Sequence, residues 1–96
     1  MSGRRIRIEE VLIHLGSDGT GFLDAMRGEG LFLAEELEPS EAEDLRVARL
    51  LFEELGVNAA GVDVALHLRR RLLALERRAR WMAAALDDAG AGRGER

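Results

Sequence analysis

The sequence predicts an all-α protein in which a small helical head is followed by one long C-terminal helix. Ala, Leu, Arg and Glu dominate the composition, and these residues favour helices over strands. Between Leu55 and Leu86, apolar residues recur at alternating spacings of three and four, the heptad period of a helix that keeps one apolar face toward a partner. The single proline, Pro39, precedes this stretch, so no proline interrupts it.

The length of the chain limits how much of this helix the head can cover. A chain of 96 residues is about one small domain, whose core is only modestly stabilising. We expect residues 1–56 to form the head, residues 57–88 the long helix, and residues 89–96 a disordered glycine-rich tail. A helix of about 29 residues spans about 43 Å, so its exposed part needs a second chain to bury the apolar face.

The chain begins with a short polar segment and a short helix. Residues 1–7 are basic, which is typical of a frayed terminus or of a short strand. The first helix is expected over residues 8–15 and stops at Gly16. Its inner face is apolar and consists of Ile8, Val11, Leu12 and Leu15.

A turn and a second short helix follow, so the first two helices form a helix-turn-helix. The composition of residues 17–21 predicts the turn, in which Asp18 or Thr20 caps the second helix. Gly28 and Gly30 end that helix. Its inward-facing residues are Phe22, Leu23 and Met26.

The next segment, residues 31–39, is expected to be an extended connector with Leu31, Leu33 and Leu37 turned inward. Ser40 and Glu43 then have the spacing of a capping box, which predicts a third helix over residues 41–55 with Gly56 as its stop. The residues expected to be buried on the third helix are Leu45, Ala48, Leu51, Phe52 and Leu55.

The long helix is expected to begin at the cap Asn58 and to end near Asp87. Its front half carries an extra apolar row, Val62, Leu66 and Leu73, which indicates packing on the head. The heptad seam continues beyond that row and predicts an isologous homodimer. The seam residues assigned to the dimer interface are Leu68, Leu72, Leu75, Ala79, Met82 and Leu86.

Charge is distributed unevenly along the chain. Residues 1–56 hold six arginines and 13 acids, whereas residues 57–96 hold eight arginines and five acids. A net-acidic chain is poorly suited to binding the phosphate backbone of nucleic acid. The arginines at 69–71, 77, 78 and 80 point around the helix in different directions, so they do not form one basic face. The acids that precede and open the third helix either solvate a connector or bind a partner. They are Glu35, Glu36, Glu38, Glu41, Glu43 and Asp44.

Nothing in the sequence indicates catalysis. The chain has no Cys, and its two histidines, His14 and His67, have no partner at the spacing of metal ligands or of a catalytic triad. We therefore predict no enzyme activity, no catalytic residue, no metal and no cofactor.

Trp81, beside the seam, is interpreted as a packing or interface residue. No run is apolar enough for a membrane span, and the start lacks the apolar core of a signal peptide, so a cytoplasmic location is expected.

The segment SEAEDLRVARLLFEELGVNAAGV, residues 40–62, resembles the second half of a MerR-type winged-helix domain. The resemblance extends over nearly the whole chain, with residues 8–15 as first helix, 21–27 as second, and 32–39 in place of the wing. It implies a winged-helix-derived head and a dimerising last helix. The chain departs from MerR-type DNA readers because Arg27 is the one cation in residues 21–27 and the wing segment carries carboxylates instead of cations.

This departure resembles the CbpM-like chaperone-modulator branch, whose last helix opens in the same way as Leu55, Val57, Asn58 and residues 60–66 do here. The resemblance implies a non-enzymatic adaptor that binds the J-domain of a CbpA/DnaJ-type co-chaperone and regulates its activity. J-domains present a basic helix, to which the acids of the front half are complementary. The alternative hypothesis is a small dimeric MerR-like transcriptional regulator that binds DNA, and a third is a dimerising structural protein.

Overall fold

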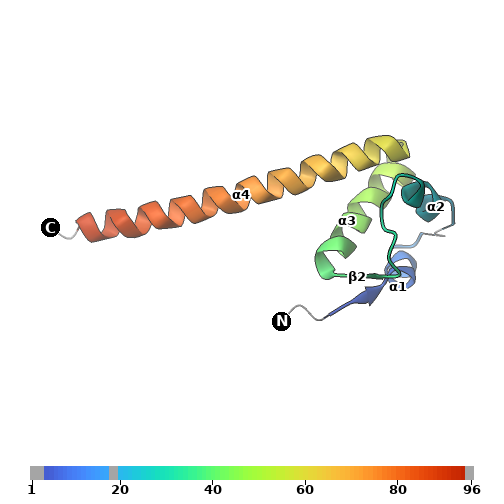
Figure 1. The fold of residues 1–96 in the computed structure, drawn as a ribbon, viewed down its shortest axis with the longest axis horizontal. Coiled ribbons are helices and arrows are strands. Elements are labelled where there is room, and N and C mark those ends of the chain that lie inside the picture. Colours follow the sequence, from blue (N-terminus) through green and yellow to red (C-terminus); the bar gives the residue numbers. More distant parts are fainter. Residues whose placement is uncertain (1–3, 18–19, 95–96) are drawn as a thin grey trace. The chain divides into compact units, whose positions relative to one another are not determined.

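The computed structural model describes residues 4–17 and 20–94, apart from the side chains of Thr20 and of residues 91–94. It confirms an all-α fold at the coarse level, because most of the chain is helical and the sheet is small (Figure 1). The chain divides into two units, Met1–Leu66 and His67–Arg96. The first unit contains the folded core and is called the head below. The helices are α1 Ile8–His14, α2 Thr20–Gly28, α3 Pro39–Arg49 and α4 Ala59–Gly94.

A two-stranded antiparallel sheet connects the start of the chain to the segment before α3. Strand β1 is Ile6–Arg7 and strand β2 is Glu36–Leu37, with Ile6 opposite Leu37 and Arg7 opposite Glu36. Of the two alternatives predicted for residues 1–7, a frayed terminus or a short strand, the structure shows the strand at Ile6–Arg7. The backbone of Ile8 also donates to the carbonyl oxygen of Glu35 at 2.9 Å, which extends the pairing.

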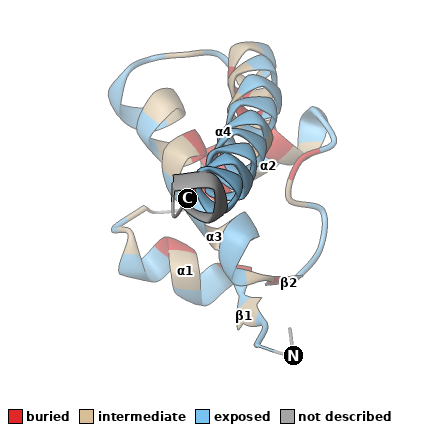
Figure 2. Ribbon diagram, turned by 90° about the vertical axis from the view of Figure 1, so that its left-hand side faces the viewer, coloured by how far each residue is buried: buried red, intermediate tan, exposed pale blue. Residues whose placement is uncertain are grey.

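The head core draws residues from every helix and from β2 (Figure 2). Phe22 of α2 is buried, and its ring centroid lies 5.8 Å from that of the half-buried Phe52 at an interplanar angle of 54°. Such tilted aromatic pairs stabilise a fold beyond the area they bury. The buried residues of the core are Ile8, Leu12, Phe22, Met26, Leu31, Leu37, Leu45, Ala48, Val62 and Leu66.

The connector before α3 differs from expectation at one leucine. Leu31 and Leu37 are buried as predicted, but Leu33 is 64% exposed. Phe32 adopts a φ of 55°, which breaks the alternation of an extended chain. Phe32 consequently packs against the core and Leu33 faces solvent.

Helix α3 begins two residues earlier than predicted. Glu38 is its N-cap and Pro39 its first residue, and the backbone N–H of Glu38 donates to Glu41 Oε1 at 2.9 Å to form a capping box. The predicted box of Ser40 and Glu43 is therefore wrong. Proline has no N–H to satisfy and its φ is already helical, so Pro39 fixes the first helical position.

The end of the third helical segment is a π-helical turn, η1 Leu50–Glu54, instead of an α-helix that continues to Leu55. The extra residue in this turn rotates the chain, so Leu55 is 65% exposed and not buried as predicted, while Leu51 and Phe52 are half-buried. Gly56 is the stop expected, with a φ of 72°.

Helix α4 is capped as predicted, because Asn58 Oδ1 accepts from the backbone N–H of Gly61 at 2.7 Å. Val62 and Leu66 are buried in the head, whereas Leu73 is 39% exposed. The first unit extends to Leu66 and so includes the first residues of α4, beyond the expected boundary at residue 56. Leu73 belongs to the second unit, and its packing on the head stays a prediction.

Helix α4 also continues to Gly94 and does not end near Asp87, so the glycine-rich tail is helical over most of its length. Each glycine in a helix costs about 1 kcal/mol relative to Ala, so the glycines weaken this part of α4. They do not end it, and the segment contains no proline that would. Residues 95 and 96 lie outside the described residues, as does the predicted cap Asp18.

Candidate interaction surfaces

The two units carry opposite net charges. Residues 1–66 hold six arginines and 14 acids, a net charge of −8, and residues 67–96 hold eight arginines and four acids, a net charge of +4. The sign changes at the boundary between the units. The net charge of the head favours the approach of basic partners, and that of the second unit favours acidic ones.

The acids predicted to bind a partner have different roles in the structure. Glu38 and Glu41 cap α3, and Asp44 is only 6% exposed. Glu43 accepts from Arg46 at 2.6 and 2.9 Å, and this hydrogen bond and the carboxylate charge raise the pKa of Arg46. Asp44 is thus not part of the predicted acidic surface, because its side chain lies inside the head.

Glu35 and Glu36 are exposed acids of this group that lie at the sheet, before α3. The side chain of Glu35 is 74% exposed although it forms an ion pair with Arg27 at 3.2 Å. Glu36 is exposed on β2, opposite Arg7, whose guanidinium donates to Glu9 at 3.1 Å. Both acids therefore present carboxylate oxygens to solvent from a backbone that the sheet fixes.

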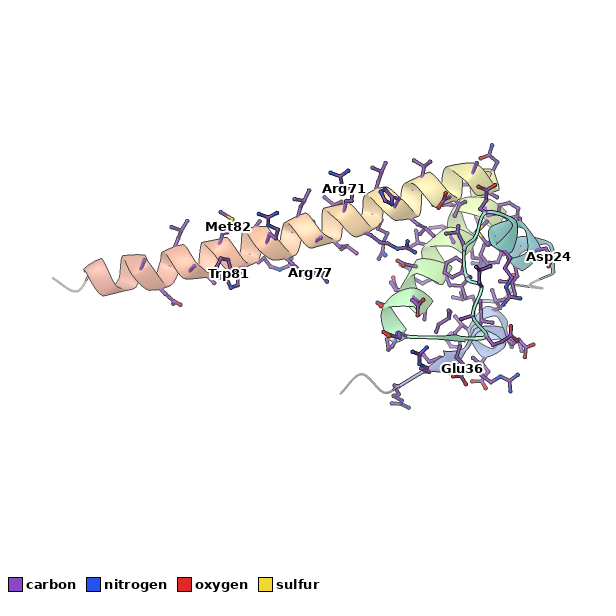
Figure 3. The ribbon with its side chains drawn as sticks, viewed as in Figure 1. Asp24, Glu36, Arg71, Arg77, Trp81 and Met82 are labelled. Carbon is purple, nitrogen blue, oxygen red and sulfur yellow. The ribbon has the colours of Figure 1, made fainter. Side chains whose placement is uncertain are left out.

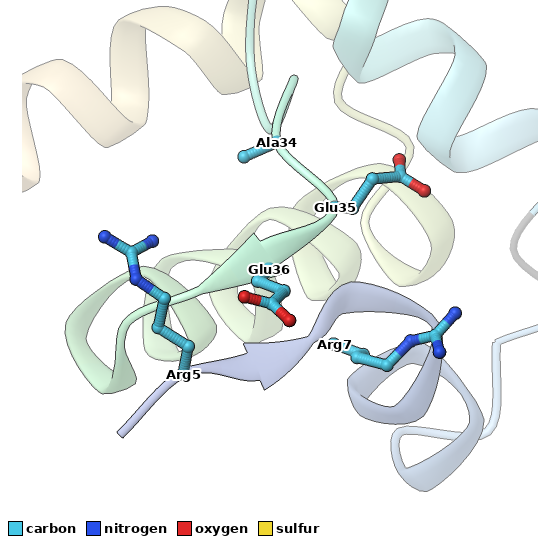
Figure 4. Close-up of a pocket in the computed structure, with 5 residues that line it drawn as sticks. All are labelled: Arg5, Arg7, Ala34, Glu35 and Glu36. Atoms are coloured by element: carbon cyan, nitrogen blue, oxygen red, sulfur yellow. The ribbon is translucent and has the colours of Figure 1, made fainter. Parts of the chain in front are cut away.

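These two acids line a surface pocket at the sheet, together with Arg5, Arg7 and Ala34 (Figure 4). All five side chains are exposed. The sequence did not indicate this pocket, because pairing between β1 and β2 brings residues 5 and 7 next to residues 34–36. The pocket is of mixed charge, so a basic partner would meet two carboxylates beside two guanidinium groups.

The single arginine of helix α2, Arg27, forms hydrogen bonds within the head. Arg27 Nε donates to the carbonyl oxygen of Phe32 at 2.9 Å, and Nη2 donates to the carbonyl oxygen of Ala34 at 3.4 Å and to Glu35. Its side chain is 31% exposed. Arg27 therefore holds the connector in place, and the exposed side chain of Asp24 adds negative charge to the same helix (Figure 3).

The second unit carries the predicted seam as an uncovered apolar row, which we call the apolar stripe. The five large side chains of the stripe are between 53% and 70% exposed in the single chain, and Ala79 is also exposed. Leucine and methionine at this exposure and helical spacing are typical of a surface that another helix covers. The stripe comprises Leu68, Leu72, Leu75, Ala79, Met82 and Leu86.

A shallow apolar groove runs along α4 beside the stripe. It is lined by Ala74, Arg77, Arg78, Trp81 and Met82. Trp81 is 72% exposed and extends from the same side of the helix as Arg77 (Figure 3). The tryptophan is thus not packed within its own chain.

Two further observations bear on what the chain does chemically. Among the described residues, no three His, Cys, Asp or Glu side chains gather as ligands of a metal ion would. In the same part of the chain, no helix combines the length and the apolarity that a bilayer span requires. The candidate surfaces are accordingly the sheet pocket of the head and the apolar stripe of α4.

Comparison of the chain with protein-family models, with curated proteins and with solved structures gives no match. Function therefore has to follow from the residues themselves.

Proposed function

We propose that the protein is a non-enzymatic, homodimeric adaptor that binds the J-domain of a CbpA/DnaJ-type co-chaperone and regulates its activity. The head, a winged-helix-derived unit, binds the J-domain. The apolar stripe of α4 joins two copies. Each of these roles requires a surface and neither requires a catalytic group.

The single observation that carries this proposal is the acidic head with Glu35 and Glu36 exposed beside its sheet. The head has a net charge of −8, and a J-domain presents a basic helix. Both carboxylates are attached to backbone that is fixed by β-pairing and by the contacts of Arg27. A rigid pair of carboxylates loses little conformational entropy when it meets a cationic helix.

Arg5 and Arg7 in the same pocket make the site selective. A uniformly basic helix would be repelled by these two guanidinium groups, so the best partner places its own acid against them. A basic helix that also carries an acidic residue fits this requirement, whereas a polyanion is repelled by Glu35 and Glu36. DNA is the weaker alternative, because Arg27 is occupied within the head and the pocket contains two acids.

The test is a calorimetric titration of the full chain with the J-domain of a CbpA/DnaJ-type co-chaperone. We expect saturable binding that weakens when salt is raised. Glu36→Gln should weaken the affinity several-fold, because it removes an exposed charge that has no structural role in capping α3. Glu29→Gln, which removes an exposed acid that does not line the pocket, is the matched control and should leave the affinity unchanged.

Absence of saturable binding at micromolar concentrations would overturn the adaptor proposal. Equal effects of Glu36→Gln and Glu29→Gln would show that the pocket is not the binding surface. Sequence-preferring binding to duplex DNA in a parallel titration would favour the transcriptional regulator instead.

A further inference from the structure

We propose that the groove around Trp81 on α4 docks a short acidic segment of another protein, with one apolar side chain of that segment on the indole ring. The groove belongs to the second unit, so the inference goes beyond J-domain binding by the head. It is called the tryptophan groove below, and its lining residues are Ala74, Arg77, Arg78, Trp81 and Met82.

Trp81 is a large apolar side chain that its own chain leaves uncovered. It is 72% exposed, and Met82 beside it is 53% exposed. Ala74, about two turns earlier, is half-buried and small, so it leaves the groove open at that end. Tryptophan and methionine side chains on a protein surface are typical of sites that hold an apolar side chain of a partner.

The tryptophan groove is distinct from the apolar stripe. Each residue of an α-helix turns the chain by about 100°, so Trp81, two residues after Ala79, points away from the stripe. Trp81 and Arg77 extend from the same side of α4 (Figure 3). Met82 is the one lining residue that the groove shares with the stripe. A helix packed on the stripe therefore leaves Trp81 and Arg77 accessible.

The arginines of the groove give it the positive charge that selects an acidic occupant. Residues 67–86 hold six arginines and one acid, Glu76, a net charge of +5. Arg77 and Arg78 are exposed, and neither forms a hydrogen bond or an ion pair within the described part of the chain. Carboxylates of a partner can therefore bind both guanidinium groups without displacing an internal acid.

The arginines of the head differ in this respect, because their charges are already matched by carboxylates of the head. Those with such an ion pair are Arg7, Arg27, Arg46 and Arg49. The unmatched guanidinium groups of the tryptophan groove are thus a property of this part of α4 and not of the whole chain.

The size of the groove and its single aromatic ring favour a peptide over nucleic acid. The distance from Ala74 to Met82 is about 12 Å along the helix, which an extended chain spans with about four residues. Proteins that bind single-stranded nucleic acid stack successive bases on several aromatic side chains. Trp81 is the only aromatic residue of the second unit.

The test is a titration of the full chain into a dye-labelled synthetic peptide, followed by the anisotropy of the dye. The peptide has about eight residues, which are glutamates around one central leucine. We expect saturable binding that weakens several-fold when salt is raised from about 0.05 M to about 0.5 M. The peptide with glutamine in place of glutamate should not bind. The peptide with serine in place of leucine should bind about tenfold more weakly.

Variants of the chain locate the binding site. Trp81→Ala should weaken binding about tenfold, Arg77→Gln should weaken it about threefold, and Trp81→Phe should keep most of the affinity. The matched control is Arg71→Gln, because Arg71 is an exposed arginine that does not line the groove and lies on the other side of α4 from Arg77 (Figure 3). Its affinity should stay unchanged. Alanine and glutamine favour helices, so circular dichroism should show α4 intact in these variants.

A second measurement observes the groove directly. Trp81 is the single tryptophan, so its indole N–H gives one resonance in a nitrogen–proton NMR spectrum. This resonance should shift as the leucine-containing peptide is added and should stay in place with the glutamine peptide.

Three results would overturn the inference. The first is the absence of saturable binding at hundreds of micromolar peptide. The second is an equal loss of affinity in Arg71→Gln and Arg77→Gln, which would mean that the peptide follows the charge of α4 and not the groove. The third is tighter binding of a labelled thymidine oligonucleotide than of the peptide, lost in Trp81→Ala, which would make the occupant a nucleic acid. The J-domain titration tests the head separately, so either proposal can fail without the other.

Discussion

Replacement of Leu66 by alanine tests where the head ends within α4. Leu66 is fully buried, whereas Leu68, two residues further along the same helix, is 58% exposed. The boundary between the two units lies between them. Leu66→Ala should therefore destabilise the head strongly, and Leu68→Ala should not, although both changes remove the same atoms from one helix.

The expected magnitudes follow from burial. Leucine to alanine removes three carbon atoms, each of which contributes about 0.8 kcal/mol when fully buried. The cavity left behind raises the total for Leu66→Ala to about 3 kcal/mol. This is a large part of the stability of so small a domain. Leu68 is less than half buried, so its replacement should cost the head about 1 kcal/mol or less.

Native-state amide hydrogen exchange in α1 and α2 is the suitable assay, because it measures the free energy of opening the head without a contribution from the second unit. The measurement should be made at two protein concentrations. Any effect of Leu68→Ala that comes from a weakened dimer should fade on dilution, whereas that of Leu66→Ala should not change.

The reasoning would be refuted by one result in particular. If Leu68→Ala lowers the protection of α1 and α2 as much as Leu66→Ala does in dilute, monomeric protein, then α4 packs into the head beyond Leu66. The assignment of the apolar stripe to a second copy would then lose its basis.

Three further predictions concern the connections between elements. Asn58→Ala should cost about 1 kcal/mol of head stability by removing the cap of α4, and Asn58→Asp, which keeps the acceptor, should cost little. Gly56→Ala should cost about 1–2 kcal/mol, because a φ of 72° strains a residue with a Cβ even though the space around Gly56 is open. Gly28→Ala is the control, since Gly28 is helical and its surroundings are also open, and it should be neutral or stabilising in circular-dichroism melts. Arg27→Met should release the connector before β2, seen as faster proteolysis there with α2 still protected, and Arg27→Lys should not restore the contacts because one ammonium cannot reach all three acceptors.

The sequence predicts those parts of the fold that depend on local signals. The cap of Asn58 and the stop at Gly56 are confirmed because each needs only a side chain and a few neighbouring backbone groups. Leu33 and Leu55 were misplaced because the left-handed backbone of Phe32 and the π-helical turn each shift which side chains face the core. Such backbone changes are set by packing, and periodicity alone does not reveal them.

The acidic segment was less predictable than the helices. Its six acids look alike in the sequence, yet Asp44 is buried, Glu38 and Glu41 cap α3, and Glu35 pairs with Arg27. The pairing between residues 27 and 35 depends on the path of the intervening loop. The mixed charge of the sheet pocket likewise needs the antiparallel pairing that sets Arg7 opposite Glu36.

The exposed position of Trp81 determines what optical spectroscopy can observe. It is the only tryptophan, and the chain has no tyrosine, so emission excited near 295 nm comes entirely from the second unit. Because Trp81 is 72% exposed, unfolding of the head should leave its emission maximum almost where it began. Fluorescence melts would therefore record the C-terminal part of α4 and miss the unfolding of the head core around Phe22 and Leu45.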